Sequence, residues 1–157
     1  LDPRHYWATD LSGALMRRGY ELELAAKDRL PPEHLIEDHN FDFPGLPPTI
    51  THAIAFAVFT HLPLDHLRHG LARIRSRFPA LETLLFTVFL APDAGHGGTV
   101  RQPDGVVTHP DRAPYHHREA EVMAAAEAAG FSLVRAQARL PRGQVLFHAT
   151  PKAPKAD

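Results

Sequence analysis

Cysteine is absent from this chain of 157 residues. Disulfide bonds and thiolate metal sites are therefore excluded. Neither sign of charge is in clear excess, because 17 Lys and Arg residues stand against 18 Asp and Glu residues. Since no basic field is present to attract a polyanion, we expect no nucleic-acid partner.

Long apolar runs are missing as well. No segment approaches the roughly 20 apolar residues with which a helix crosses a bilayer. No basic stretch followed by an apolar one opens the sequence either. We therefore expect a cytoplasmic protein without a membrane partner, and the chain length predicts one domain. The chain opens with Leu1 and then Asp-Pro-Arg, a turn-like start that suggests further sequence upstream.

The apolar segments that are present alternate between strand-like and helix-like patterns, which is typical of an α/β fold. The run 50–59 is almost continuously apolar and predicts a strand buried on both faces. In 65–78, apolar residues recur every three or four positions, which predicts an amphipathic helix. The expected strands are 5–9, 35–36, 50–59, 83–90, 131–138 and 144–150, and the expected helices are 12–19, 65–78 and 119–129.

Two connections are informative. The link 140–143 is too short for the crossover that parallel strands need, so the last two strands must be antiparallel neighbours. Segment 91–115 is rich in glycine and proline and too long for an ordinary connection. Segments of that length usually carry function or are disordered.

A series of segments, taken in order, has a familiar form: YWATDLSGALMRRG, HNFDF, ITHAIAFAVFTHLP, LLFTVFL, PYHHREAEVMAAAEAAGF and LPRGQVLFHA. They resemble the class I, Rossmann-like methyltransferases that use S-adenosylmethionine (SAM), and a bacterial group of these in particular. The resemblance implies a mainly parallel Rossmann-like sheet with helices on both faces and a C-terminal antiparallel hairpin.

The resemblance begins at the second strand of that fold. Residues 1–150 would be a partial methyltransferase domain, and 151–157 a frayed polar tail. The family's first strand and its glycine-rich loop have no counterpart, since the glycines at 95–98 follow a different strand. In the family this strand lies between the strands that end at Asp10 and at 59. We therefore expect unpaired strand edges, self-association and poor cofactor binding by the chain alone.

Asp10 is the first candidate for a cofactor contact, because it ends the first expected strand. Ligands of open α/β sheets bind at the carboxyl ends of strands, where a carboxylate can accept the hydroxyl hydrogens of a ribose. A cap on the following helix explains the same residue equally well. The resemblance implies the ribose contact.

The resemblance implies further contacts with SAM. Leu11 would pack on the adenine, and Asn40 and Phe41 would meet its edge and face. Ala57 and Phe59 would line the pocket beneath the sulfonium. For both phenylalanines the alternative is a place in the core.

His61 is the candidate catalytic residue, because it follows a strand end and imidazole suits a general base near neutral pH. The resemblance favours a different task, lining the pocket or fixing the start of the next helix. His66 and His69 have a spacing that can chelate a metal. However, Leu67 and Leu71 define the buried face of that helix, and no HExxH motif is present, so we expect no metal site.

Four residues border the long segment at which the family admits its acceptor: His109, Tyr115, His116 and His117. They are candidates for binding a small-molecule substrate. In a chain with 12 histidines, a place on the surface without a ligand explains them as well.

The leading interpretation is an enzyme that transfers a methyl group from SAM to a small or medium-sized acceptor. The alternative is a non-catalytic relic or partner subunit that keeps the sheet and no longer binds the cofactor. A nicotinamide-dependent oxidoreductase is a third interpretation, opposed by the terminal hairpin and by the lack of a Tyr-x-x-x-Lys motif.

Overall fold

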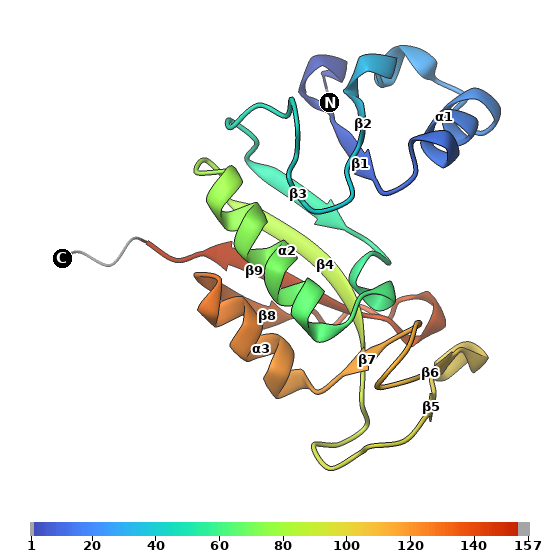
Figure 1. Cartoon of the computed structure of the whole chain (residues 1–157), viewed down its shortest axis with the longest axis vertical. Coiled ribbons are helices and arrows are strands. Elements are labelled where there is room, and N and C mark those ends of the chain that lie inside the picture. The colour runs from blue at the N-terminus through green and yellow to red at the C-terminus, as the bar shows by residue number, and fades with distance from the viewer. Residues whose placement is uncertain (1, 154–157) are drawn as a thin grey trace. The chain divides into compact units, whose positions relative to one another are not determined.

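The computed structural model of the protein describes residues 2–153, and the chain divides into two compact units, residues 1–48 and 49–157 (Figure 1). Residues 154–157, most of the tail that the sequence predicts to fray, lie outside the described residues. Within the described part, no helix is long and apolar enough to span a bilayer.

The first unit contains a parallel pair of short strands, β1 (Ala8–Asp10) and β2 (Leu35–Glu37), connected through helix α1 (Gly13–Leu22). Ser12 caps this helix, because its hydroxyl oxygen accepts the N–H of Leu15 at 3.2 Å. The remaining elements are the 3-10 turns η1 (Pro3–His5), η2 (Lys27–Arg29) and η3 (Pro32–His34).

The second unit is built on one sheet in the order β3-β4-β9-β8. Strand β3 pairs parallel with β4, whereas β9 lies antiparallel between β4 and β8. The sequence-based prediction of a terminal antiparallel pair is therefore confirmed. The strands are β3 (His52–Ala55), β4 (Thr83–Leu90), β8 (Phe131–Arg135) and β9 (Val145–Pro151), and the short β7 (His116–His117) pairs with the end of β4.

Helices α2 (Leu64–Arg77) and α3 (Glu119–Ala128) pack side by side on one face of this sheet (Figure 1). Three aromatic rings fill the core beneath them. The rings of Phe86 and Phe147 stack at 5.7 Å, and Phe59 meets Phe86 edge-on at 5.5 Å. All three side chains are completely buried, which makes this layer the main apolar contribution to stability.

The prediction that 50–59 forms a strand buried on both faces is wrong. Strand β3 covers only 52–55, and the side chain of Ile54 is 65% exposed. Ile54 pairs with Leu85, and His148 and Val134 continue the same row across the sheet. Val134 is 63% exposed, so this row is open to solvent. A continuous apolar run is buried on both faces only if both are covered, and α2 and α3 cover one.

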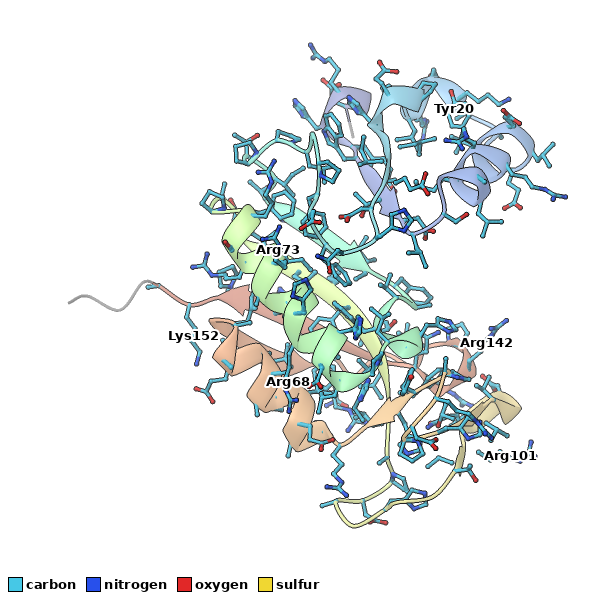
Figure 2. All side chains as sticks on the ribbon, viewed as in Figure 1. Tyr20, Arg68, Arg73, Arg101, Arg142 and Lys152 are labelled. Carbon is cyan, nitrogen blue, oxygen red and sulfur yellow. The ribbon has the colours of Figure 1, made fainter. Side chains whose placement is uncertain are left out.

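Segment 91–115 contains regular structure of its own. It holds the short antiparallel pair β5 (Val100–Arg101) and β6 (Val107–Thr108) with the turn η5 (Pro103–Gly105) between them. This turn meets η6 (Pro141–Gly143), where the N–H of Arg142 donates to the carboxylate of Asp104 at 3.0 Å. Arg101 and Arg142 are labelled at this end of the unit in Figure 2.

The start of the expected tail is held in place. Strand β9 includes Pro151, and the N–H of Lys152 donates to the carbonyl of Gly130 at 2.8 Å. The ammonium of Lys152 forms an ion pair with Glu127 at 2.8 Å, and its carbonyl accepts from Arg75 at 3.2 Å (Figure 2). Lys152 therefore belongs to the folded unit.

Strand edges lead to the first prediction. Among residues 2–153, β1 has only β2 as a ladder partner and β3 has only β4. Unpaired edges beside exposed apolar side chains favour association between copies. We predict that the 157-residue chain self-associates and that Ile54→Lys reduces this association while changing the free energy of unfolding by no more than about 0.5 kcal/mol.

Light scattering over a concentration series measures this effect. Leu22→Lys on α1 is the matched control, because Leu22 is 71% exposed but lies on a helix. If both substitutions reduce self-association equally, the effect is due to the added charge and not to the strand edge. A chain that is monomeric at all concentrations would refute the prediction.

Candidate functional site

The loop that follows β2 is shaped by Asp38. Its carboxylate accepts the backbone N–H of Asn40 and of Asp42, each at 3.1 Å, and that of Phe43 at 2.9 Å. Partial burial alone would raise the pKa of Asp38, but these hydrogen bonds and the neighbouring His39 outweigh it and lower the pKa. One carboxylate thus fixes the backbone of residues 40–43.

This loop contains backbone strain. Phe41 has φ +56° and Phe43 has φ +51°, both in the left-handed region of backbone conformation that residues other than glycine seldom adopt. Such conformations cost about 1–3 kcal/mol each and persist only where the surroundings enforce them. Phe43 is buried and serves as core, whereas Phe41 is half-buried and Asn40 is exposed. The predicted adenine contacts at 40 and 41 therefore stand on a rigid loop.

Asp10 ends β1, as the sequence predicts. Its Oδ1 accepts the N–H of Ser12 at 2.8 Å, and its side chain is exposed. Because Ser12 is the cap of α1, the alternative that Asp10 caps this helix does not hold. Leu11, between them, is 64% exposed. Both predicted cofactor residues are therefore accessible.

The loop that follows β3 is held by two buried threonines. The N–H of Ala57 donates to the hydroxyl of Thr87 at 2.8 Å, and its carbonyl accepts from the hydroxyl of Thr60 at 2.9 Å. Thr87 in turn donates to the side-chain carbonyl of Gln144 at 2.6 Å. Ala57 has φ +58°, so this network enforces a strained backbone at a predicted cofactor residue.

The short helix η4 (Phe59–His61) follows directly. Phe59 is completely buried against Phe86, so its side chain is core, the alternative that the sequence left open. His61 is exposed, and its imidazole has no hydrogen-bond partner within residues 2–153. It is available to a ligand, and no second group orients it.

A cavity of about 220 Å³ opens in the second unit where β4, β7 and α3 meet. It is lined by Leu64, Ala91, His96, Gly97, Pro110, His116, His117, Arg118 and Glu121. His116 and His117 are both buried. Their Nε2 atoms are the only buried side-chain polar atoms in the described chain that lack a hydrogen-bond partner. An unpaired buried group costs about 1–3 kcal/mol, so these two atoms call for a partner.

The structure brings only part of the predicted acceptor set together. His116 and His117 line the cavity, whereas His109 and Tyr115 lie beside it, outside the lining. Tyr115 stacks on His117 with ring centroids at 6.3 Å, and His109 accepts the N–H of His116 through its carbonyl at 3.0 Å. His109 and Tyr115 therefore contact His116 and His117 from outside the cavity.

Sequence reasoning missed the residues that shape these loops: Asp38, Thr60, Thr87, Gln144 and Thr108. Each acts through hydrogen bonds to residues distant in the sequence or in an irregular loop, which periodicity does not reveal. No group of three or more His, Asp or Glu side chains able to hold a metal ion occurs within residues 2–153.

The Asp38 loop generates the second prediction. Asp38→Ala should lower the free energy of unfolding by about 1–3 kcal/mol near neutral pH, because it removes the acceptor of three backbone N–H groups. The pKa of Asp38 is lower in the folded than in the unfolded chain. Its stabilisation is therefore complete above the unfolded-state pKa and disappears as the pH falls through the folded-state pKa.

Denaturant unfolding followed by fluorescence measures this loss. The single tryptophan, Trp7, reports on the first unit because it stacks on His34 at 3.7 Å. Asp28→Ala, at an exposed carboxylate of the same unit, is the control and should change little. A loss that is as large in acid as at neutral pH would exclude the carboxylate as its cause.

The chain was compared with known proteins. No family model and no curated protein matches it. Solved structures do match. A magnesium protoporphyrin IX methyltransferase from Synechocystis PCC 6803 with bound SAM is 16% identical at a TM-score of 0.57, over 93% of this chain and 59% of that chain.

Other matches are of the same kind. A 1,6-didemethyltoxoflavin-N1-methyltransferase from Burkholderia thailandensis with bound S-adenosylhomocysteine is 17% identical at a TM-score of 0.58, over 93% of this chain and 60% of that chain. DhpI in complex with S-adenosylhomocysteine (SAH) is 17% identical at a TM-score of 0.59, over 94% of this chain and 66% of that chain. The chain thus spans between 59% and 66% of the length of these enzymes. It has the fold of the class I, Rossmann-like methyltransferases.

Proposed function

We propose that the protein binds SAM and transfers its methyl group to a small-molecule acceptor. The observation that carries this proposal is backbone strain. Phe41 and Ala57, both predicted cofactor residues, have positive φ and are fixed by Asp38 and by the threonine pair. Strain of this kind concentrates at ligand sites, where a rigid backbone reduces the entropy lost on binding.

Each unit supplies its own contacts in this proposal. In the first unit, the exposed carboxylate of Asp10 accepts the ribose hydroxyls, Leu11 packs on the adenine, and Asn40 and Phe41 meet its edge and face. In the second unit, Ala57 leaves room beside the sulfonium. Buried Phe59 supports this loop from the core.

The fold and the cofactors of its matches support this assignment. SAM supplies an electrophilic methyl group that is displaced in line by the acceptor. Such a displacement needs alignment and the exclusion of water, and it needs a base only where the acceptor must lose a proton. The rigid loops at 38–43 and 57–60 suit the alignment task. The proposed setting is the bacterial cytoplasm: the bacterial origin rests on the sequence resemblance, and the location rests on the composition.

The alternative is a relic that does not bind the cofactor. It gives no reason for the backbone strain at Phe41 and Ala57, which lowers stability, whereas a ligand site does. We therefore prefer the enzyme.

The third prediction concerns Asp10. In a protein that includes the upstream glycine-rich segment, Asp10→Ala should weaken SAM binding by about 1–3 kcal/mol, because the ribose hydroxyls lose a charged acceptor. Isothermal titration calorimetry measures the affinity. Asp93→Ala is the matched control, since Asp93 makes the same kind of bond, from the N–H of Gly95 at 2.9 Å. Equal SAM affinity of the Asp10 variant and of the same longer protein with Asp10 unchanged would remove the ribose assignment.

The fourth prediction concerns His61. If its imidazole is the base, His61→Gln should reduce turnover strongly and remove an acidic limb from the pH–rate profile. If it lines the pocket or supports the fold, the Michaelis constant or the melting temperature changes and the profile keeps its shape. Because no second group orients His61, we expect the profile to keep its shape. Loss of the acidic limb would restore His61 as the base.

A further inference from the structure

Gln144 is a buried polar residue at the point where the chain enters β9. Its Oε1 accepts the hydroxyl hydrogen of Thr87 at 2.6 Å. Thr87 pairs with Leu146, two residues further along β9, so Gln144 and Thr87 are diagonal neighbours across the two strands. Side chains therefore connect β4 to the turn before β9, in addition to the backbone ladder.

The two hydrogen bonds of Thr87 fix the direction of its hydroxyl hydrogen. A hydroxyl group has one hydrogen to donate and two lone pairs. The N–H of Ala57 can only donate, so at 2.8 Å it occupies a lone pair of the Thr87 oxygen. The hydroxyl hydrogen then needs an acceptor, because a buried polar group without a partner is costly, and Oε1 of Gln144 is that acceptor. Gln144 thus determines which side of the Thr87 oxygen faces Ala57.

The backbone of Ala57 depends on this support, because its φ of +58° is strained. Two hydroxyl groups hold it. Thr60 donates to the Ala57 carbonyl at 2.9 Å, but Thr60 belongs to the same loop. Thr87 accepts the Ala57 N–H and belongs to β4. Of these two bonds, the one to Thr87 is therefore the one that ties the strained loop to the sheet.

The turn that precedes Gln144 is also held closely. In η6, Arg142 has φ +63° and Gly143 has φ +75°. A Cβ atom at Gly143 would lie 2.6 Å from Cδ of Pro103, so this close approach requires glycine. The N–H of Arg142 donates to the carboxylate of Asp104 at 3.0 Å. Gln144 therefore extends from a backbone that two contacts with η5 fix.

We infer that Gln144 is a positioning residue of the cofactor site, which acts through Thr87 on the backbone of Ala57. This inference rests on the proposed binding of SAM, in which Ala57 leaves room beside the sulfonium. Gln144 bonds to Thr87, so its effect on the cofactor is indirect. Loss of its oxygen lets the Thr87 hydrogen turn towards another acceptor, which weakens the bond to Ala57 and allows the strained loop to relax.

A purely structural role for Gln144 predicts a different outcome, and two substitutions separate the roles. Gln144→Leu removes the acceptor and buries only apolar atoms. Gln144→Glu keeps an oxygen acceptor at the same position but buries a carboxyl group, which lowers stability. If Gln144 only stabilises the sheet, the loop at Ala57 follows the stability of each variant. If Gln144 positions the loop, Ala57 follows the presence of the acceptor.

Amide hydrogen exchange of Ala57 tests the first step without cofactor. It is followed by nuclear magnetic resonance in the 157-residue chain and in the chain with Ile54→Lys, which limits self-association. Gln144→Leu should make the Ala57 amide exchange about three- to tenfold faster, as the loss of one hydrogen bond predicts. Gln144→Glu should restore slow exchange although it lowers the melting temperature. Gln137→Leu, at an exposed glutamine between β8 and β9, is the matched control and should leave the exchange unchanged.

A double-mutant cycle tests whether the effect passes through Thr87. Thr87→Val keeps the shape of the side chain and removes the hydroxyl, so it should accelerate the exchange of Ala57 as Gln144→Leu does. In the Thr87→Val background, Gln144→Leu should have no further effect on Ala57. Additive effects would overturn the inference. An Ala57 amide that does not respond to Gln144→Leu, or that Gln144→Glu does not restore, would overturn it as well.

Calorimetry with SAM, in the longer protein used for Asp10, keeps this inference apart from the proposed function. Gln144→Leu should weaken SAM binding at least about threefold, and Gln144→Glu should restore it. If the unchanged protein binds SAM and Gln144→Leu binds it equally well, the positioning role is refuted and the proposed function stands. If the unchanged protein does not bind SAM, the proposed function fails and the positioning of cofactor fails with it, whereas the exchange data still decide whether Gln144 supports Ala57.

Discussion

The hydroxyl of Thr87 is the contact on which the second unit's site depends. It accepts the N–H of Ala57 and donates to Gln144, so it joins the loop after β3, the middle of β4 and the residue that precedes β9. Thr87 is completely buried, and such a group is tolerated only when its hydrogen bonds are made. Here they are, and the result is a strained backbone at Ala57 that holds its shape before any ligand arrives.

The sheet that carries this contact is asymmetric. Helices α2 and α3 bury the face that contains Phe86 and Phe147, whereas the row from Ile54 to Val134 faces solvent. Strand β4 is therefore central in its hydrogen bonding, with partners on both sides, and within the second unit α2 and α3 cover one face of the sheet. The site proposed in the second unit lies at the carboxyl ends of β3 and β4, the place where open α/β sheets bind their ligands.

Two kinds of preorganisation meet at this edge. Around Ala57, hydrogen bonds restrict the backbone, and at His116 the hydroxyl of Thr108 restricts the ring. The Nε2 atoms of His116 and His117 have no hydrogen-bond partner within residues 2–153. The two are connected, because the carbonyl of Thr60 in η4 accepts the N–H of Tyr115 at 2.7 Å. A change in either therefore reaches the other through a few bonds.

The sequence by itself determined the order of strands and helices, the antiparallel end of the sheet and the position of Asp10. Periodicity, capping by Ser12 and the short link at 140–143 act locally, so they can be read along the chain. Burial of 50–59 was misjudged, because covering a face requires elements elsewhere in the fold. Only the tertiary structure revealed the roles of Asp38 and Thr87 and the unpaired Nε2 atoms of His116 and His117. The hydrogen bonds of Asp38 and Thr87, and the burial of the two histidines, arise only when the chain has folded, and no local sequence pattern indicates them.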